Sequence, residues 1–261
     1  VLEADSAEVM FGAWIYLPSL QPASFPSSSA SMKTIVSTKV SGCRVSSDSA
    51  NSHGWSLFVH EWATTNRQLR FSWTDQFSAC HEIYSSSALV PYDAWVHVGF
   101  SMSLGRNAVR LFIGGEVVVD TSSGLGLYVK QGQMLPMAQV TFSGRMVARK
   151  ELIVGAHAPQ PHDGGRGQSH MFLGFMGDVR LLHETSPVPS LELTKLMARA
   201  QDGKSPSTVF QIQFAKGTPV ANSISGEFLT THSVTGEAGV QLPVMQFSQK
   251  PRRSTQMVPH N

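Results

Sequence analysis

Three histidines and an aspartate gather in a segment rich in proline and glycine, residues 156–170. Imidazole nitrogens and a carboxylate can bind a divalent metal ion together, or exchange hydrogen bonds with a polar ligand. Their spacing fits no zinc-finger pattern, and the glycines favour a loop. A solvated loop at the rim of the fold is therefore the alternative to a binding site. The candidate residues are His157, His162, Asp163 and His170.

Three aromatic side chains, two of them at the ends of predicted strands, could stack on sugars, because an aromatic face suits the apolar face of a pyranose. Trp62, Trp73 and Tyr128 are candidates for this role, and packing in the core is the alternative for the two tryptophans. Three further tryptophans lie inside predicted strands, where we expect them to belong to the core: Trp14, Trp55 and Trp95.

The composition is that of a globular chain. Of its 261 residues, 41% are hydrophobic and 15% are charged, which is enough to bury a core. The net charge of +2 is too small and too dispersed to predict nucleic-acid binding. No stretch of roughly 18 apolar residues predicts a transmembrane helix, so we expect no membrane insertion. Cys43 and Cys80 could form a disulfide or remain buried thiols, which leaves the compartment open.

A β-hairpin and a third strand behind it are predicted over residues 93–120. Val96 and Val98 alternate with Trp95 and His97, the period of a half-buried strand, so we expect His97 to lie opposite the apolar face. Gly114-Gly115 would form a tight two-residue turn. The hairpin also carries residues of opposite sign that could hold it together, Arg110 and Asp120.

Short alternating or β-branched segments predict strands along most of the remaining chain. They are residues 9–17, 34–40, 54–62, 68–73, 81–84, 151–155, 172–182 and 209–214. Met176 and Val179 can both face inward only across a bulge, which Gly177 would seat. A helical period occurs once, over residues 193–200.

Many short strands, one helix and long polar loops predict an all-β protein. We expect an antiparallel β-sandwich of jelly-roll type with a short C-terminal helix. The sandwich domain would span residues 1–242, and residues 243–261 would be a basic, flexible tail or linker.

Six motifs occur in a fixed order between residues 9 and 199: F-G-A-W-I-Y, T-I-V-S-T-K, G-W-S-L-F-V, D-A-W-V-H-V with R-L-F-I-G-G-E-V, L-I-V-G, and F-L-G-F-M-G-D-V-R-L-L. This string resembles the laminin-G-like, concanavalin-A-like jelly rolls, in particular their pentraxin-like branch. The resemblance implies a non-catalytic recognition module that binds glycan or protein, flanked by other domains. It favours an extracellular or cell-surface protein. Similar sandwiches also serve inside cells as assembly domains of trafficking scaffolds, which is the alternative.

The sequence departs from the pentraxin pattern in two places. Where that pattern has a cysteine after the W-x-H motif, this chain has Val98 or Gly99, so the pentraxin disulfide is absent. Where family members often carry a first acidic residue this chain has Gly177, and no acidic cluster for a calcium pair stands out. We therefore expect no cofactor, with Asp163 and Asp178 as weak candidates for a metal ligand.

The sequence carries no pattern typical of a catalytic site. Sandwich enzymes that cut glycans place carboxylates on one strand as E-x-D-x-E, so that the acids project from one face. Glu82 and Glu227 lack an acidic residue two positions on. No G-x-S-x-G, H-E-x-x-H or phosphate-binding glycine loop occurs. We expect a protein that is not an enzyme, with a glycan-active enzyme of unfamiliar acid pair as the third hypothesis.

Overall fold

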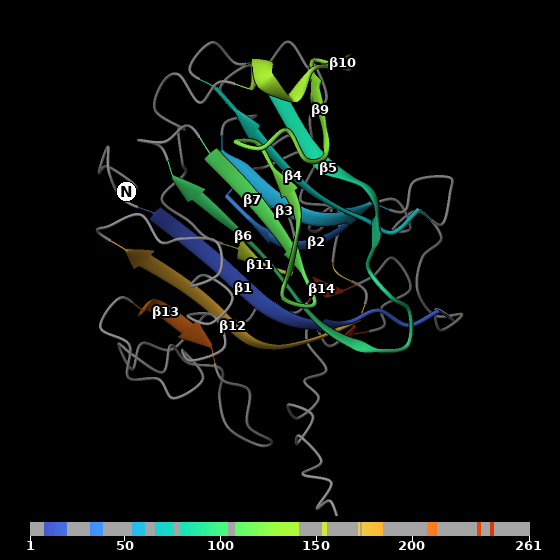
Figure 1. Ribbon diagram of the computed structural model, residues 1–261. Helices are drawn as coiled ribbons and strands as arrows, with labels where there is room; N and C mark the ends of the chain where they lie inside the picture. Colours follow the sequence, from blue (N-terminus) through green and yellow to red (C-terminus); the bar gives the residue numbers. More distant parts are fainter. Residues whose placement is uncertain are drawn as a thin grey trace, which may run out of the picture.

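The computed structural model describes residues 8–19, 32–38, 54–60, 66–75, 79–103, 108–140, 153–155, 172, 174–184, 208–212, 234–235 and 241–242. Its strands form two antiparallel sheets that lie face to face (Figure 1). The six-stranded sheet has the order β13 (Thr208–Ile212), β12 (Phe175–Glu184), β1 (Glu8–Tyr16), β6 (Trp95–Ser103), β7 (Ala108–Ile113) and β8 (Glu116–Asp120).

The seven-stranded sheet forms the second layer. Its order is β10 (Gln133–Leu135), β9 (Leu127–Lys130), β5 (Cys80–Leu89), β4 (Gln68–Thr74), β3 (Trp55–His60), β2 (Met32–Ser37) and β11 (Ile153–Val154). A separate pair consists of β14 (Val234–Thr235) and β15 (Gln241–Leu242). The predicted all-β sandwich is confirmed.

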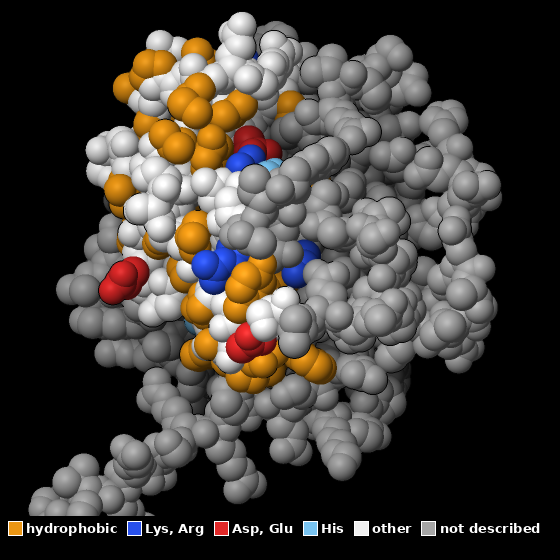
Figure 2. All heavy atoms as spheres, turned by 90° about the vertical axis from the view of Figure 1, so that its right-hand side faces the viewer, with side chains coloured by type: hydrophobic (Ala, Val, Ile, Leu, Met, Phe, Trp, Pro, Cys, Tyr) orange, Lys and Arg blue, Asp and Glu red, His pale blue; other side chains and the backbone are white. Residues whose placement is uncertain are grey.

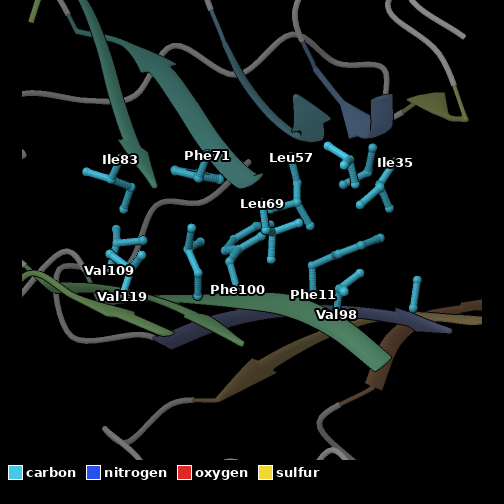
Figure 3. Close-up of a cluster of buried hydrophobic side chains, with 14 of the residues drawn as sticks. Phe11, Ile35, Leu57, Leu69, Phe71, Ile83, Val98, Phe100, Val109 and Val119 are labelled. Atoms are coloured by element: carbon cyan, nitrogen blue, oxygen red, sulfur yellow. The ribbon is translucent and has the colours of Figure 1, made fainter. Parts of the chain in front are cut away.

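The core lies between the two sheets and follows from the two-residue period of their strands. Figure 3 shows Ile35, Leu57 and Phe71 extending from the seven-stranded sheet toward Phe11 and Phe100 of the six-stranded sheet. The rings of Phe71 and Phe100 meet across this layer with centroids 4.7 Å apart. Such close packing of large apolar side chains supplies most of the driving force for folding.

The predicted hairpin is confirmed in detail. Strands β6 and β7 pair in register, and β7 turns into β8 at Gly114 and Gly115, which have φ of 63° and 91°. Positive φ at both central residues is the conformation of a type I′ turn, whose twist suits a hairpin. Arg110 and Asp120 stand opposite each other, and the Arg110 Nε lies 3.2 Å from the Asp120 Oδ2.

The predicted bulge in β12 is also confirmed. Opposite the single residue Ala13 of β1 stand two residues of β12, Asp178 and Val179, directly after Gly177. The extra residue lets Met176 and Val179 both enter the core, where they are 6% and 0% exposed.

Other segments differ from expectation. Strand β5 runs over ten residues instead of the predicted four, and residues 127–135, for which the sequence predicts no definite strand, form a hairpin of β9 and β10. A short 3-10 helix, η3 (Met137–Gln139), follows. The predicted helix at residues 193–200 and the tail at 243–261 lie outside the described residues. In the part of the chain that the structure describes, no helix is long and apolar enough to cross a membrane.

Candidate functional site

The histidine-rich rim loop lies outside the described residues, so the structure does not test it. This applies to His157, His162, Asp163 and His170, and to Trp62. Asp178 lies on β12, but its side chain is not described. Among the described residues, no group of three or more histidine, cysteine, aspartate or glutamate side chains is placed to hold a metal ion.

Trp73 packs in the core and offers no open face to a sugar. It is 1% exposed, and its indole stacks on the ring of His81 with centroids 4.9 Å apart and planes 12° apart. Tyr128, the other described stacking candidate, is also 1% exposed. Core packing was the alternative for Trp73, and the structure places it there because residue 73 shares the inward parity of Leu69 and Phe71.

A buried polar chain joins Asp75, His81 and Tyr128. The His81 Nε2 lies 3.0 Å from the Asp75 Oδ2, and the His81 Nδ1 lies 2.8 Å from the Tyr128 hydroxyl. Burial, together with the charge of Asp75, raises the pKa of Tyr128 to about 12, so the phenol keeps its proton at neutral pH. A hydroxyl beside a histidine and an aspartate is the arrangement of an activated nucleophile. Here His81 and Tyr128 are each 1% exposed and so are closed to a substrate. Their hydrogen bonds instead hold β4, β5 and β9 together.

Cys80 opens β5 immediately before His81, and it forms a disulfide. The chain has one other cysteine, Cys43, which lies outside the described residues. Of the two alternatives left by the sequence, the disulfide therefore holds for Cys80.

The outer face of the seven-stranded sheet carries a polar network. Arg70 donates from Nη1 to Glu82 over 2.5 Å and from Nη2 to Gln68 over 2.6 Å, and its guanidinium lies 4.2 Å from the centre of the Tyr84 ring. His60 adds a contact of 3.1 Å with Asn66, which donates to Gln68. Burial lowers the pKa of His60, so its imidazole is neutral at pH 7. These contacts link β3, β4 and β5 and stabilise their pairing.

The outer face of the six-stranded sheet is different, because aromatic rings gather there at one end. They come from three adjacent strands, β12, β1 and β6, and each alternates with a core residue. We call the group the aromatic surface. It consists of Trp14, Tyr16, Trp95, His97 and Phe175, all partly exposed.

The rings of the aromatic surface touch one another. Tyr16 lies between Phe175 and Trp95, with centroid distances of 5.8 and 5.9 Å, and Trp14 meets His97 at 5.6 Å. Interplanar angles of 54° to 69° make these contacts tilted or edge-to-face, which is the favoured geometry for aromatic pairs. These contacts restrict the rotation of the side chains, so the aromatic surface has a defined shape.

An exposed carboxylate borders the aromatic surface. Asp93 accepts hydrogen bonds from the Tyr16 hydroxyl over 3.4 Å and from the Ser19 backbone N–H over 2.9 Å. Its own N–H donates to the Leu17 carbonyl over 2.8 Å, which fixes the residue at the end of β1. Hydrogen bonds from the side chain and backbone of Ser19 hold the pKa of Asp93 below its ordinary value, so it is ionised at neutral pH.

Figure 2 looks at the side of the molecule where β1 ends and β6 and β12 begin. Hydrophobic side chains gather in the lower part of the described surface, with an acidic group among them. An apolar area with a hydrogen-bond acceptor at its edge suits a ligand that has both an apolar face and hydroxyl groups.

The expectation that Trp14 and Trp95 belong to the core is wrong. Trp55 does belong to it at 2% exposed, whereas Trp14 and Trp95 have the outward parity of their strands. The expectation for His97 is confirmed, because it lies opposite the apolar face and packs against Trp14. The signal was present in the sequence: the alternation that assigns Val96 and Val98 to the core places Trp95 on the other face.

No protein-family model matches the chain, and no curated protein matches it. Among solved structures it is similar to a Bacteroides ovatus protein provisionally described as carbohydrate binding, with a TM-score of 0.50 and 11% identity over 84% of this chain and 50% of that one. The fold is a concanavalin-A-like jelly roll.

Two further solved structures are similar to this chain at lower TM-scores. One is the CBM40 domain of a Ruminococcus gnavus sialidase bound to α2,3 sialyllactose, with a TM-score of 0.46 and 9% identity over 74% of this chain and 84% of that one. The other is a heptameric SAP-like pentraxin from Limulus polyphemus, with a TM-score of 0.42 and 13% identity over 74% and 71%. The jelly roll spans half the length of the Bacteroides ovatus protein. Likeness at this level of identity is a likeness of fold.

Proposed function

We propose that the chain is a non-catalytic module that binds carbohydrate through the aromatic surface. The observation that carries the proposal is the gathering of five aromatic side chains on the outward face of β12, β1 and β6, with an ionised carboxylate at its border. A soluble sheet normally turns polar residues to solvent, so a cluster of this kind marks a binding surface. Sugars combine an apolar ring face with hydroxyls, which fits rings beside an acceptor.

The scaffold supports this role mechanically. The rings extend from paired strands, and the inward neighbours of Tyr16 and Trp95, which are Ile15 and Val96, are 0% and 8% exposed in the core. Binding groups on rigid elements lose little conformational entropy when a ligand arrives. The provisional description of the Bacteroides ovatus protein agrees with carbohydrate binding.

A glycan array followed by titration calorimetry tests the proposal. Trp95→Ala and Tyr16→Ala should each weaken the binding of an array hit about tenfold or more, as expected for aromatic anchors. Met134→Ala is the matched control, because Met134 is 64% exposed on β10 of the other sheet. Circular dichroism and the Tm of each variant show that the fold is retained. A blank array, or folded variants that bind as well as the parent, would contradict the proposal.

A second candidate function is docking of a protein partner on the same surface, as in an intracellular assembly domain. Aromatic residues are enriched in the buried centre of protein interfaces, and this favours the candidate. A pull-down with the folded parent, repeated with Trp95→Ala, separates the two functions when the array is blank.

Three further parts of the proposal rest on sequence alone. The laminin-G-like, pentraxin-like branch is one, and the position of the sandwich within a larger, multidomain protein is another. The third is a contribution of the rim loop, for which His157→Ala combined with His162→Ala should weaken glycan binding. If that double variant binds as the parent does, the loop is only a solvated rim.

A further inference from the structure

The border of the aromatic surface carries a fixed negative charge. Asp93 is exposed, and its carboxylate accepts hydrogen bonds from Tyr16 and Ser19. The contact with the Tyr16 hydroxyl ties the charge directly to one of the rings. A ligand that covers Tyr16 therefore meets this carboxylate.

Among the described residues, Asp93 forms no ion pair with the two arginines near this region. Arg180 of β12 pairs with Gly12 of β1, two residues before Trp14. It is 4% exposed, so it does not offer its guanidinium to solvent. Arg67 lies with its guanidinium 4.6 Å from the centre of the Tyr92 ring and donates to the Val90 carbonyl over 3.2 Å. The Arg67 guanidinium is thus held against a ring and a carbonyl, and the Arg180 side chain is buried.

His97 is the basic side chain of the aromatic surface. Its imidazole meets the indole of Trp14 at 5.6 Å, with the planes 69° apart. The Asp93 carboxylate is the acidic group that borders these rings.

We propose that the aromatic surface selects uncharged glycans over anionic ones, and that Asp93 is the residue that makes this selection. A carboxylate accepts strong hydrogen bonds from sugar hydroxyls, whereas it repels a sialic acid, uronic acid or sulfate group. The inference rests on the proposed function, since it concerns the ligand of the same surface.

The size of the selection follows from simple electrostatics. Two unit charges about 4 Å apart in water repel one another enough to lower affinity roughly fivefold, and salt screens this effect. An anionic glycan should therefore bind several-fold more weakly than its neutral parent at low salt. The difference should shrink in about 0.5 M salt, where the screening length is only a few ångströms.

Asp93→Asn is the decisive variant. Asp93 has φ of 55°, a left-handed conformation that asparagine tolerates well, so the backbone is undisturbed. Binding of a neutral oligosaccharide should weaken, because a charge-assisted acceptor is lost. Binding of the same oligosaccharide capped with sialic acid or sulfate should strengthen relative to the neutral one. The affinity for the neutral oligosaccharide should thus fall while the ratio of anionic to neutral affinity rises. A general loss of folding would lower both affinities alike and leave the ratio unchanged.

Glu116→Gln is the matched control, because Glu116 is an exposed acid of the same sheet on β8, three strands away from β1. It should leave the ratio of anionic to neutral affinity unchanged. The measurement is calorimetry at pH 7.5 with matched neutral and anionic oligosaccharides, in low and high salt. Anionic glycans that bind the parent as tightly as neutral ones, or a ratio that Asp93→Asn leaves unchanged, would overturn the inference while the proposed function survives. Absence of binding by every glycan would overturn both.

Discussion

The indole of Trp95 reaches from β6 across β1 to Gly177 of β12. Its Cζ3 lies 3.8 Å and its Cη2 4.0 Å from the position that a Cβ would occupy at residue 177. Since neighbouring strands lie about 4.8 Å apart, a side chain that spans two of these gaps must lie across the sheet. The glycine that follows Met176 and precedes the bulge therefore also underlies part of the aromatic surface.

A larger side chain at residue 177 should displace this indole. Gly177→Leu is expected to destabilise the fold by about 1–3 kcal/mol through overpacking and to weaken glycan binding. The emission of Trp95, obtained by subtracting the spectrum of a Trp95→Phe variant, should shift to the red as the indole enters water. Gly177→Ala is the control, because its Cβ would be in ordinary contact with the ring. Equal spectra for the leucine and alanine variants would show that Trp95 does not rest on residue 177.

The pair of Arg110 and Asp120 predicts a loss of stability in acid. Burial opposes ionisation of Asp120, but hydrogen bonds from Ser122 and the charge of Arg110 outweigh it and hold its pKa below the ordinary value. A depressed folded-state pKa gives stability that is present above the unfolded pKa, near 4, and is lost as the pH falls through the folded value. Asp120→Asn should remove about 1 kcal/mol at pH 7 and less near pH 3. Urea unfolding at both pH values measures this, and a cost that is equal at both would contradict it.

The raised pKa of Tyr128 predicts a loss of stability in alkali. Its pKa is raised to about 12 in the folded protein, above the unfolded value near 10. A raised pKa gives stability that is fully present below pH 10 and is lost as the pH rises toward 12. Tyr128→Phe leaves the His81 Nδ1 without the hydroxyl and should cost about 1–3 kcal/mol at pH 7. The variant should then lose less stability than the parent between pH 9 and about 11, and parallel pH profiles would refute this account.

The disulfide predicts the chemistry of the thiols. Thiol titration of the denatured, unreduced protein should find no free thiol, and reduction should release both cysteines of the chain. Because Cys43 is the one other cysteine, Cys43→Ser and Cys80→Ser should each destabilise the fold, by roughly 3–4 kcal/mol for a loop of this length. Cys43→Ser in a reduced sample should cost little more than reduction alone. Two reactive thiols in the unreduced protein would contradict the bridge.

Much of the fold could be predicted because strand alternation is a local property. The hairpin of β6 and β7 and the bulge after Gly177 follow from the parity of a few apolar residues. The type I′ turn follows from two consecutive glycines. These features depend on neighbours in the chain, which a sequence displays directly.

The candidate site was harder to predict, because it depends on which strands become neighbours. Trp14 and Phe175 are far apart in the chain, and β1 brings them to one surface only by pairing with β12. Tryptophan is among the most buried residue types on average, so its hydrophobicity favoured the core and outweighed its parity. The contact of Trp73 with His81 and Tyr128 likewise requires three paired strands.

Outward and core-facing residues alternate along the same strands, so ligand preference and fold stability depend on different residues. Natural or laboratory evolution could therefore change one of these two properties without the other. Along β1 and β6 the outward positions alternate with positions that face the core, so a substitution at Trp14 or His97 leaves Ala13 and Val98 in place. A library restricted to the outward positions would therefore sample new ligand preferences on an unchanged frame.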